Sequence, residues 1–504
     1  MRCDHHPTCP GCPLLDREPA EQLTIKRDRL QAAFDAFPHL QLGVVPPVGP
    51  AARTEGYRHR LKLPVHVGQN RVTMGLIDPV SKRVLHTPDC PVLAPALREA
   101  IPPLLAALHR QKALHSVDLR VSSSTGALQL VLSARQGKFH RHDAFIARVK
   151  QAVPNLTSLA VSKADQHRRR IMGRDPQVAA GDIQITEKIG ETELHIFPGA
   201  FFQADPLTAA GLHAVVREAV GDAQVVLDLY AGVGAYARML APGRERVVAV
   251  EEIPAAAAAA QEGAPENLEV ICERAEALDL AALGPFDAAV INPARRGSRP
   301  AVLAALAQAT QRLVYVSCSP ETLARDLDVL AHHGMRVVSV SPLDLFPQTS
   351  EVEAVVTLER SRDLRRWPTG EGEARGPWGD DEPSGALGRP QRLLALVIGE
   401  TDEHGTLQQG RYRRLDTLAG HSLLRIDLKG AVVPALAELA RAGHPTAGRH
   451  EPTNRFFAER AGLLRPFVHI ERTVEGSAPL HGDLVLALRA LGASDRLLAR
   501  AGAP

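Results

Sequence analysis

Cys318 is the residue in this chain whose surroundings best suit nucleophilic chemistry. It stands just past an apolar run, in the sequence Leu313-Val314-Tyr315-Val316-Ser317-Cys318-Ser319-Pro320. Ligands of open α/β sheets bind beyond the carboxyl ends of the strands, and the flanking serines and proline should end this strand and leave the thiol accessible. A lone buried cysteine more often serves as a small apolar side chain, which is our interpretation of Cys272.

A carboxylate further along the chain gives this thiol a partner. Glu353 enters an apolar strand at the end of the run Phe346-Pro347-Gln348-Thr349-Ser350-Glu351-Val352-Glu353, where a carboxylate is otherwise costly. Such a pair suits methylation of uracil at carbon 5, which is a poor nucleophile until a thiolate adds to carbon 6. A base must then remove the carbon-5 proton so that the cysteine can leave. We predict Cys318 as the nucleophile and Glu353 as the base, and we expect the site to lower the pKa of the thiol.

A glycine-containing loop follows an earlier strand and opens a helix. It reads Asp228-Leu229-Tyr230-Ala231-Gly232-Val233-Gly234-Ala235-Tyr236-Ala237, and its glycines allow a tight turn and a close approach to a ligand. The same spacing also fits a dinucleotide fingerprint. Asp228, placed to meet an amino group, and Glu251, at the end of the next strand and placed to accept hydrogen bonds from ribose hydroxyls, favour S-adenosylmethionine. A glycine turn in an unrelated α/β protein is the alternative.

Cysteines also gather near the amino end. Cys3, Cys9 and Cys12 are spaced C-x5-C-x2-C, and Cys90 lies much further along. Four thiolates suffice to hold a [4Fe–4S] cluster. Zinc is the alternative, since His5 and His6 lie close by.

Length and composition limit the possible class of protein and its domain organisation. The chain has 504 residues, 45% of them hydrophobic, so we expect several folded units. Its formal net charge of +2 neither favours nor excludes binding to nucleic acid. No apolar run is long enough to span a membrane and no secretory signal is present, so we expect a cytoplasmic protein. Alternating short apolar runs and helical stretches over residues 196–360 predict a parallel sheet buried on both faces. Residues 46–195 look like mixed strands and helices, residues 361–391 like a linker, and residues 392–504 like a small α/β unit.

Together these motifs resemble the uridine-C5 RNA methyltransferases, particularly the iron–sulfur branch that modifies 23S ribosomal RNA, over about residues 3–360. The resemblance implies that Cys3, Cys9, Cys12 and Cys90 hold a [4Fe–4S] cluster, and that residues 1–45 form an iron–sulfur segment ahead of an α+β RNA-binding domain. It also implies a Rossmann-like S-adenosylmethionine domain over residues 196–360. Within it, Ser317-Cys318-Ser319-Pro320 matches the nucleophile motif and Val352-Glu353 the motif of the base. The implied cofactor-binding residues are Gln203 (in Phe201-Phe202-Gln203-Ala204-Asp205), Tyr230, Gly232, Gly234, Glu251 and Asn292.

Several features depart from the family pattern or extend beyond it. Asn292 replaces an aspartate in the run Asn292-Pro293-Ala294-Arg295, which suggests a second hypothesis, an RNA-binding protein with a decayed active site. A dinucleotide-dependent oxidoreductase is a third. Residues 411–485 resemble, more faintly, the non-catalytic half of ribosomal pseudouridine synthases. Basic runs at residues 57–62, 138–142 and 167–170 are candidate RNA contacts. We expect a monomer that acts on ribosomal rather than transfer RNA.

Overall fold

The computed structural model describes residues 1–360, apart from gaps at 38–39, 41, 136–138, 165–170 and 172–173. Beyond them it describes five strands between residues 390 and 473, residues 402–403, and the single residues 488, 494 and 497. The chain divides into two compact units. The first comprises Met1–Leu30, Val45–Pro320 and Val338–Glu359, and the second Gln31–Val44, Glu321–Val337 and Arg360–Pro504. The predicted linker lies almost wholly outside the described residues.

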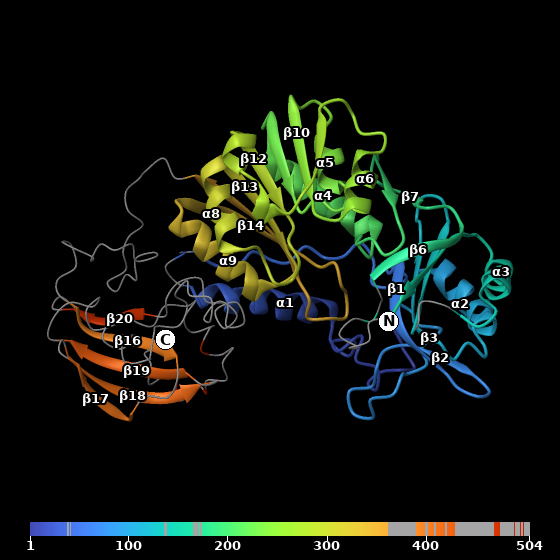
Figure 1. The fold of residues 1–504 in the computed structure, drawn as a ribbon, viewed down its shortest axis with the longest axis horizontal. Helices are drawn as coiled ribbons and strands as arrows, with labels where there is room; N and C mark the ends of the chain where they lie inside the picture. Colours follow the sequence, from blue (N-terminus) through green and yellow to red (C-terminus); the bar gives the residue numbers. More distant parts are fainter. Residues whose placement is uncertain are drawn as a thin grey trace. The chain divides into compact units, whose positions relative to one another are not determined.

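A seven-stranded sheet forms the centre of the first unit, in the order β11-β10-β9-β12-β13-β15-β14 (Figure 1). Its strands are short apolar runs, which suit a sheet that is buried on both faces. The short apolar runs of residues 196–360 supply these strands, which have the bounds β9 Val225–Leu229, β10 Arg246–Glu251, β11 Leu268–Cys272, β12 Phe286–Ile291, β13 Thr310–Ser317, β14 Met335–Leu343 and β15 Glu353–Arg360.

A parallel sheet was expected over residues 196–360, but the observed sheet is mixed. The four pairs among β9, β10, β11, β12 and β13 are parallel, but β15 runs antiparallel to β13. The strand order reverses between β9 and β12, and ligands of such sheets bind at that switch point. Helices α4 Pro206–Val220, α5 Ala235–Leu240, α6 Pro254–Gln261 and α8 Pro300–Ala309 connect the strands.

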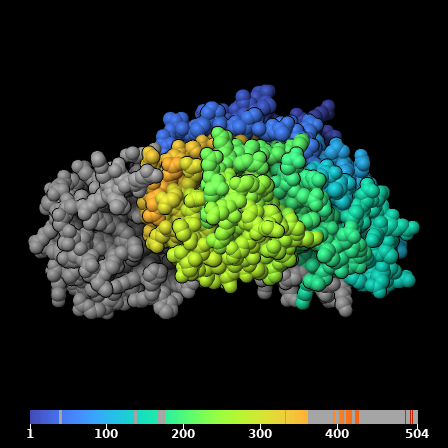
Figure 2. All heavy atoms as spheres, turned by 90° about the horizontal axis from the view of Figure 1, so that it is seen from above, coloured from blue at the N-terminus to red at the C-terminus, as the bar shows by residue number. Residues whose placement is uncertain are grey.

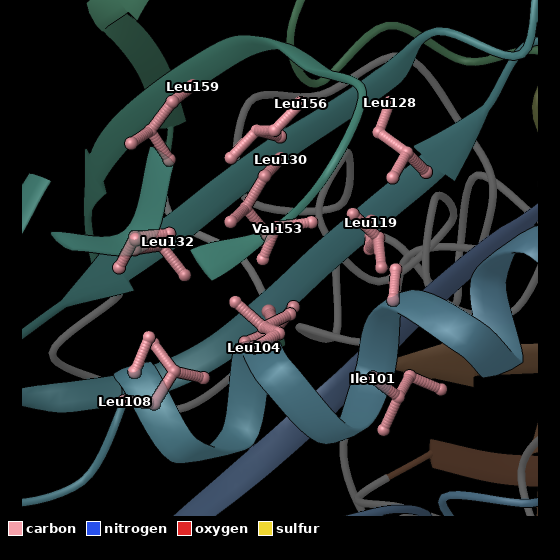
Figure 3. Packing of buried hydrophobic residues seen from close by; sticks show 14 of the residues in the cluster. Ile101, Leu104, Leu108, Leu119, Leu128, Leu130, Leu132, Val153, Leu156 and Leu159 are labelled. Carbon is pink, nitrogen blue, oxygen red and sulfur yellow. The ribbon is translucent and has the colours of Figure 1, made fainter. Parts of the chain in front are cut away.

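A second sheet of six strands occupies the central part of the chain, in the order β2-β1-β3-β4-β5-β6. Figure 3 shows Ile101 and Leu104 of α2, and Leu108 at its C-cap, packing against leucines of this sheet, all of them buried. The mixed strands and helices expected over residues 46–195 are thus present, while a separate RNA-binding domain there stays a prediction. Its elements are β1 Arg60–Val67, β2 Val72–Met74, α2 Pro95–Ala107, β3 Leu114–Val121, β4 Leu128–Ala134, α3 His142–Ala152, β5 Leu156–Lys163 and β6 Arg174–Gly181.

A two-stranded hairpin lies across residue 195, where a domain boundary was predicted. Its strands are β7 Ile185–Ile189 and β8 Thr192–Ile196. The apolar side chains of the hairpin pack in one cluster with Ala209 of α4 and Ala259 of α6. The hairpin therefore packs with helices that flank the seven-stranded sheet, and the domain boundary at residue 195 stays a prediction.

The helix α1, Pro19–Asp35, follows the N-terminal cysteines. Its side chains bond to residues near 350, and Figure 2 shows the blue N-terminal atoms beside the orange ones of this region. None of the helices in the described residues is long and apolar enough to cross a membrane.

Within the second unit, the described part of the C-terminal region is a five-stranded sheet in the order β17-β18-β19-β16-β20. All of its pairs are antiparallel. The likeness of residues 411–485 to pseudouridine synthases stays a prediction. The elements of this unit are α9 Pro320–His332, β16 Pro390–Ile398, β17 His404–Leu407, β18 Gly410–Leu418, β19 His421–Leu428 and β20 Val468–Thr473.

Candidate active site

The predicted site residues gather along one edge of the seven-stranded sheet. Tyr230 follows β9, Glu251 ends β10, Asn292 follows β12 and Cys318 follows β13. These four strands are parallel to one another, so their carboxyl ends share that edge. Glu353 reaches the same edge because it begins the antiparallel strand β15.

The strand register brings Cys318 and Glu353 side by side. On β13 and β15, Val316 lies opposite Val355 and Ser317 opposite Ala354. The next position along this ladder is Cys318 opposite Glu353, and directly opposed side chains have their Cβ atoms about 5 Å apart. Cys318 is partly accessible, whereas Glu353 is 3% exposed. The two side chains that were assigned as nucleophile and base are therefore neighbours.

The electrostatics of this pair differ from the expectation. Burial raises the pKa of the Cys318 thiol, and the negative charge of Glu353 raises it further, while the Arg295 guanidinium acts in the opposite direction. The prediction that the surrounding side chains lower the pKa of the thiol is thus wrong. Burial also raises the pKa of Glu353, from its ordinary value of 4.5 to about 8. At neutral pH most of the Glu353 carboxyl is protonated, so its charge opposes the thiolate little.

Arg295 is a site residue to which the sequence analysis assigned no role. Its positive charge lowers the pKa of both Cys318 and Glu353, and its Nη2 lies 3.5 Å from Glu351 Oε2. The only signal in the sequence was its place in the motif Asn292-Pro293-Ala294-Arg295. Its position allows it to stabilise negative charge that develops near the thiol.

The loop after β9 has a shape that fits a ligand. Gly232 has φ of +59°, and a Cβ atom added there would meet nothing within 4 Å. Tyr230 also has a positive φ, of +67°, and its hydroxyl lies 2.7 Å from that of Ser298. Strained backbone of this kind persists where its surroundings hold it, often at ligand sites. The open side of Gly232 is a surface that a nucleoside can approach.

Gly234 serves packing. Its φ is +77°, and an added Cβ would come within 2.9 Å of Ala260 Cβ. The glycine thus lets α5 begin close to α6. A direct contact of Gly234 with a cofactor remains a prediction.

Two carboxylates hold this loop. Glu251 accepts hydrogen bonds from the backbone N–H of Gly232 through Oε2 and of Ile253 through Oε1, both at 2.8 Å. Asp228 is fully buried and accepts from the Ala237 N–H at 2.9 Å through Oδ2, while its Oδ1 has no hydrogen-bond partner. Burial raises the pKa of Asp228 from 3.8 to about 7. An unpartnered buried oxygen is costly, and a ligand amino group would satisfy it.

The segment that carries Gln203 is fixed by the six-stranded sheet. Arg60 Nη1 and Arg120 Nη2 both donate to the Ala200 carbonyl, at 2.6 and 2.7 Å. Asp205 caps α4 by accepting from the Leu207 N–H. Gln203 therefore lies in a backbone that is anchored on both sides, and its contact with a cofactor is untested, as is that of Asn292.

The four predicted cluster ligands approach one another, namely Cys3, Cys9, Cys12 and Cys90. Burial raises the pKa of Cys12 to about 11, and the charges of Cys90, Cys9 and Cys3 contribute to this rise. All four are partly buried. Among the described residues, however, no three His, Cys, Asp or Glu side chains lie close enough together to hold a single metal ion. The [4Fe–4S] cluster and the zinc alternative both stay predictions.

Three smaller predictions concern Cys272 and the basic runs. Cys272, interpreted as a core residue, is exposed. In the basic run at 57–62, Tyr57 is 1% exposed and the Arg60 guanidinium pairs with Asp118. These two side chains are thus engaged inside the protein. The run at 167–170 and Lys138 lie outside the described residues.

Comparison with known proteins supports the family suggested by the sequence. Residues 272–361, which contain Cys318 and Glu353, match the sequence model of the tRNA (Uracil-5-)-methyltransferase family. The chain is 29% identical over 377 residues to the "Uncharacterized RNA methyltransferase OB0768" of Oceanobacillus iheyensis, covering 70% of this chain and 82% of that protein. It is 28% identical to the "Uncharacterized RNA methyltransferase GSU1452" of Geobacter sulfurreducens, covering 71% of this chain and 76% of that protein.

A solved structure shares the fold. The tRNA (uracil-54, C5)-methyltransferase of Pyrococcus abyssi, in complex with S-adenosyl-L-homocysteine, superposes with a TM-score of 0.57 at 24% identity, covering 70% of this chain and 86% of that one. The predicted Rossmann-like α/β fold is thus confirmed, and both relatives carry the name RNA methyltransferase.

Proposed function

We propose that this protein methylates carbon 5 of a uridine in RNA through a covalent bond between Cys318 and carbon 6 of the base. The observation that carries the proposal is the register of β13 and β15, which places Cys318 and Glu353 next to each other at the sheet edge where the Gly232 loop lies. This pair of side chains is the one that the chemistry requires, and the match of residues 272–361 to the uracil-5-methyltransferase family covers it.

S-adenosylmethionine fits the residues at the neighbouring strand ends. The open space at Gly232 would admit the nucleoside, the Glu251 carboxylate would accept hydrogen bonds from the ribose hydroxyls, and Asp228 Oδ1 would accept one from the amino group. When bound, this cofactor supplies an electrophilic methyl group. Glu251 retains lone pairs for such bonds because each oxygen accepts only one of the hydrogen bonds given above.

The chain's own residues account for the remaining steps. The Cys318 thiolate adds to carbon 6 of the uracil, and the electron pair of the 5,6 double bond moves toward oxygen 4. Carbon 5 thereby becomes nucleophilic toward the methyl group that bound S-adenosylmethionine would supply, whose bond to sulfur would break to leave S-adenosylhomocysteine. Glu353 takes the proton from carbon 5, the electrons of that carbon–hydrogen bond restore the double bond, and the bond between sulfur and carbon 6 breaks to release the thiolate. Arg295 is placed to stabilise the thiolate before and after the reaction.

The proposal is tested by transfer of a labelled methyl group to unmodified RNA. The wild-type protein should produce 5-methyluridine, whereas Cys318→Ala should produce none. Cys272→Ala is the matched control, because this cysteine is exposed and lies on β11, and it should retain full activity. Absence of transfer by the wild type to ribosomal and transfer RNA would favour an RNA-binding protein with a decayed site. Binding of a dinucleotide in place of S-adenosylmethionine would favour an oxidoreductase.

The finer assignments belong to the same proposal. We favour ribosomal RNA as the substrate, as in the iron–sulfur branch that the motifs resemble, and mapping 5-methyluridine in RNA from a deletion strain tests this choice. Cys3, Cys9, Cys12 and Cys90 would hold a [4Fe–4S] cluster, which would tie the N-terminal segment to residue 90. The convergence of the four thiols supports this assignment.

A further inference from the structure

Lys26 is a buried lysine at the amino-terminal half of α1, far in sequence from the candidate site. Its side chain is 0% exposed. Nζ donates three hydrogen bonds, to Asp344 Oδ1 at 2.6 Å and to the carbonyl oxygens of Phe346 and Glu351 at 2.9 Å each. An ammonium group has three N–H donors, so these acceptors use all of them. A buried charge is tolerated when it is fully paired in this way.

All three acceptors belong to the loop that leads to Glu353. This loop, residues 344–352, connects the end of β14 at Leu343 to the start of β15. Lys26 bonds to its first residue and to two carbonyls on its opposite sides, so it ties the two legs of the loop together. Asp344 Oδ1 also accepts from the Phe346 N–H at 3.0 Å. The last of the bonded carbonyls, that of Glu351, lies only two residues before Glu353.

Further contacts hold the tip of the same loop. Gln348 has φ of +68° and is 5% exposed. Its backbone N–H donates to Gln22 Oε1 at 2.9 Å and its Oε1 accepts from Gln22 Nε2 at 2.8 Å. Its carbonyl accepts from the Leu14 N–H at 3.0 Å. A residue in the left-handed region needs such support from outside, and α1 and the segment before it provide it.

We propose that Lys26 is a positioning residue, which holds the 344–352 loop so that the Glu353 carboxylate stays against Cys318. Lys26 bonds to the loop and reaches the reaction only through it. The inference rests on the proposed function, because it assigns Lys26 to the step in which Glu353 removes the carbon-5 proton. A displacement of about 1 Å at a reacting group can lower a rate about 100-fold.

The experiment compares the rate constant and the covalent adduct in matched variants. Glu353→Gln lacks the base, so it should form the bond between Cys318 and RNA and accumulate the methylated adduct, visible as RNA that stays attached in denaturing gels. Lys26→Met should do the same, with kcat lowered about 100-fold and KM for S-adenosylmethionine nearly unchanged, since Gly232 and Glu251 are not involved. Arg27→Met removes a positive charge from the next position of α1, where the arginine pairs only with Asp28 among the contacts described, and should behave as wild type.

A second variant separates positioning from folding. Lys26→Met leaves Asp344 buried without its cation, which destabilises the protein. Lys26→Met with Asp344→Asn removes that unpaired charge and should recover most of the lost melting temperature, yet still accumulate the adduct. Recovery of both stability and kcat in the double variant would overturn the inference. So would loss of activity without any adduct in Lys26→Met and in the double variant, if Glu353→Gln does trap the adduct. If Glu353→Gln itself traps no adduct, the assignment of Glu353 as base fails, and the inference fails with it.

Discussion

The burial of Glu353 makes the release of product depend on pH. The side chain is 3% exposed, and its pKa is raised from 4.5 to about 8, chiefly by burial. A base must be ionised to accept a proton. The ionised fraction of Glu353 is therefore about one tenth at pH 7 and about nine tenths at pH 9, because each pH unit from the pKa changes the ratio of the two forms tenfold.

The measurement is the decay of the covalent adduct after it has formed. We expect the first-order decay rate to rise about tenfold between pH 7 and pH 9, when adduct formed at one pH is transferred rapidly to another and sampled in denaturant. Starting from the adduct removes the ionisation of Cys318 from the measured step. With an ordinary carboxyl pKa of 4.5, the rate would be flat over this whole range.

The neighbouring charge supplies a matched variant. The negative charge of Glu351 raises the pKa of Glu353, so Glu351→Gln should move the midpoint of the decay profile to lower pH and leave its plateau unchanged. A decay rate that is independent of pH between 6 and 9 in the wild type would refute the reasoning, since Glu353 would then be ionised throughout. A profile that Glu351→Gln shifts upward would contradict the assigned electrostatics.

Four further outcomes are expected. Gly232→Ala should weaken binding of S-adenosylmethionine, measured by calorimetry, with little loss of stability, because its Cβ enters open space and the strain of a positive φ is on the order of 1 kcal/mol; unchanged affinity would argue against a cofactor at this loop. Gly234→Ala should instead lower the melting temperature, because its Cβ would meet Ala260 at 2.9 Å, and a stable variant would contradict the packing role. Cys12→Ser should lose the iron, inorganic sulfide and visible absorbance expected of a [4Fe–4S] cluster, and a wild-type protein that binds only zinc would overturn the cluster. Burial raises the pKa of Asp228 from 3.8 to about 7, so the stability that this carboxyl contributes is present below pH 4 and is lost as the pH rises through 7. Asp228→Asn should therefore be more stable than wild type at pH 9, by on the order of 4 kcal/mol. Equal stability of the two proteins in denaturant titrations would count against a buried carboxylate.

Much of the sheet could be predicted because its strands are local patterns. The apolar run Val225–Leu229 forms β9, because a short apolar segment bounded by turn residues is typical of a buried strand. The loop after β9 could also be predicted, because it too is a local pattern. Its glycines and the carboxylates that end strands lie within a few residues of the elements that position them.

The rest of the site depends on contacts between distant residues. Lys26 and Asp344 are separated by 318 positions, and nothing in the surroundings of Lys26 in the sequence distinguishes it from a surface lysine on an amphipathic helix. The pKa of Cys318 was predicted in the wrong direction for a similar reason. The residues that bury the thiol are set by tertiary packing, and burial disfavours the thiolate whatever the local motif.

The direction of β15 decides whether the candidate site exists at all. Cys318 follows the carboxyl end of β13, and Glu353 stands at the amino end of β15. If the sheet were wholly parallel, as the apolar runs suggested, those two ends would lie on opposite edges, about 25 Å apart for a strand of eight residues. The antiparallel pairing of β13 with β15 instead brings them into register. The reversal requires the chain to return from β14 through the 344–352 loop. The hydrogen bonds that Lys26 and Gln22 of α1 make to this loop therefore fix the segment that sets the direction of β15.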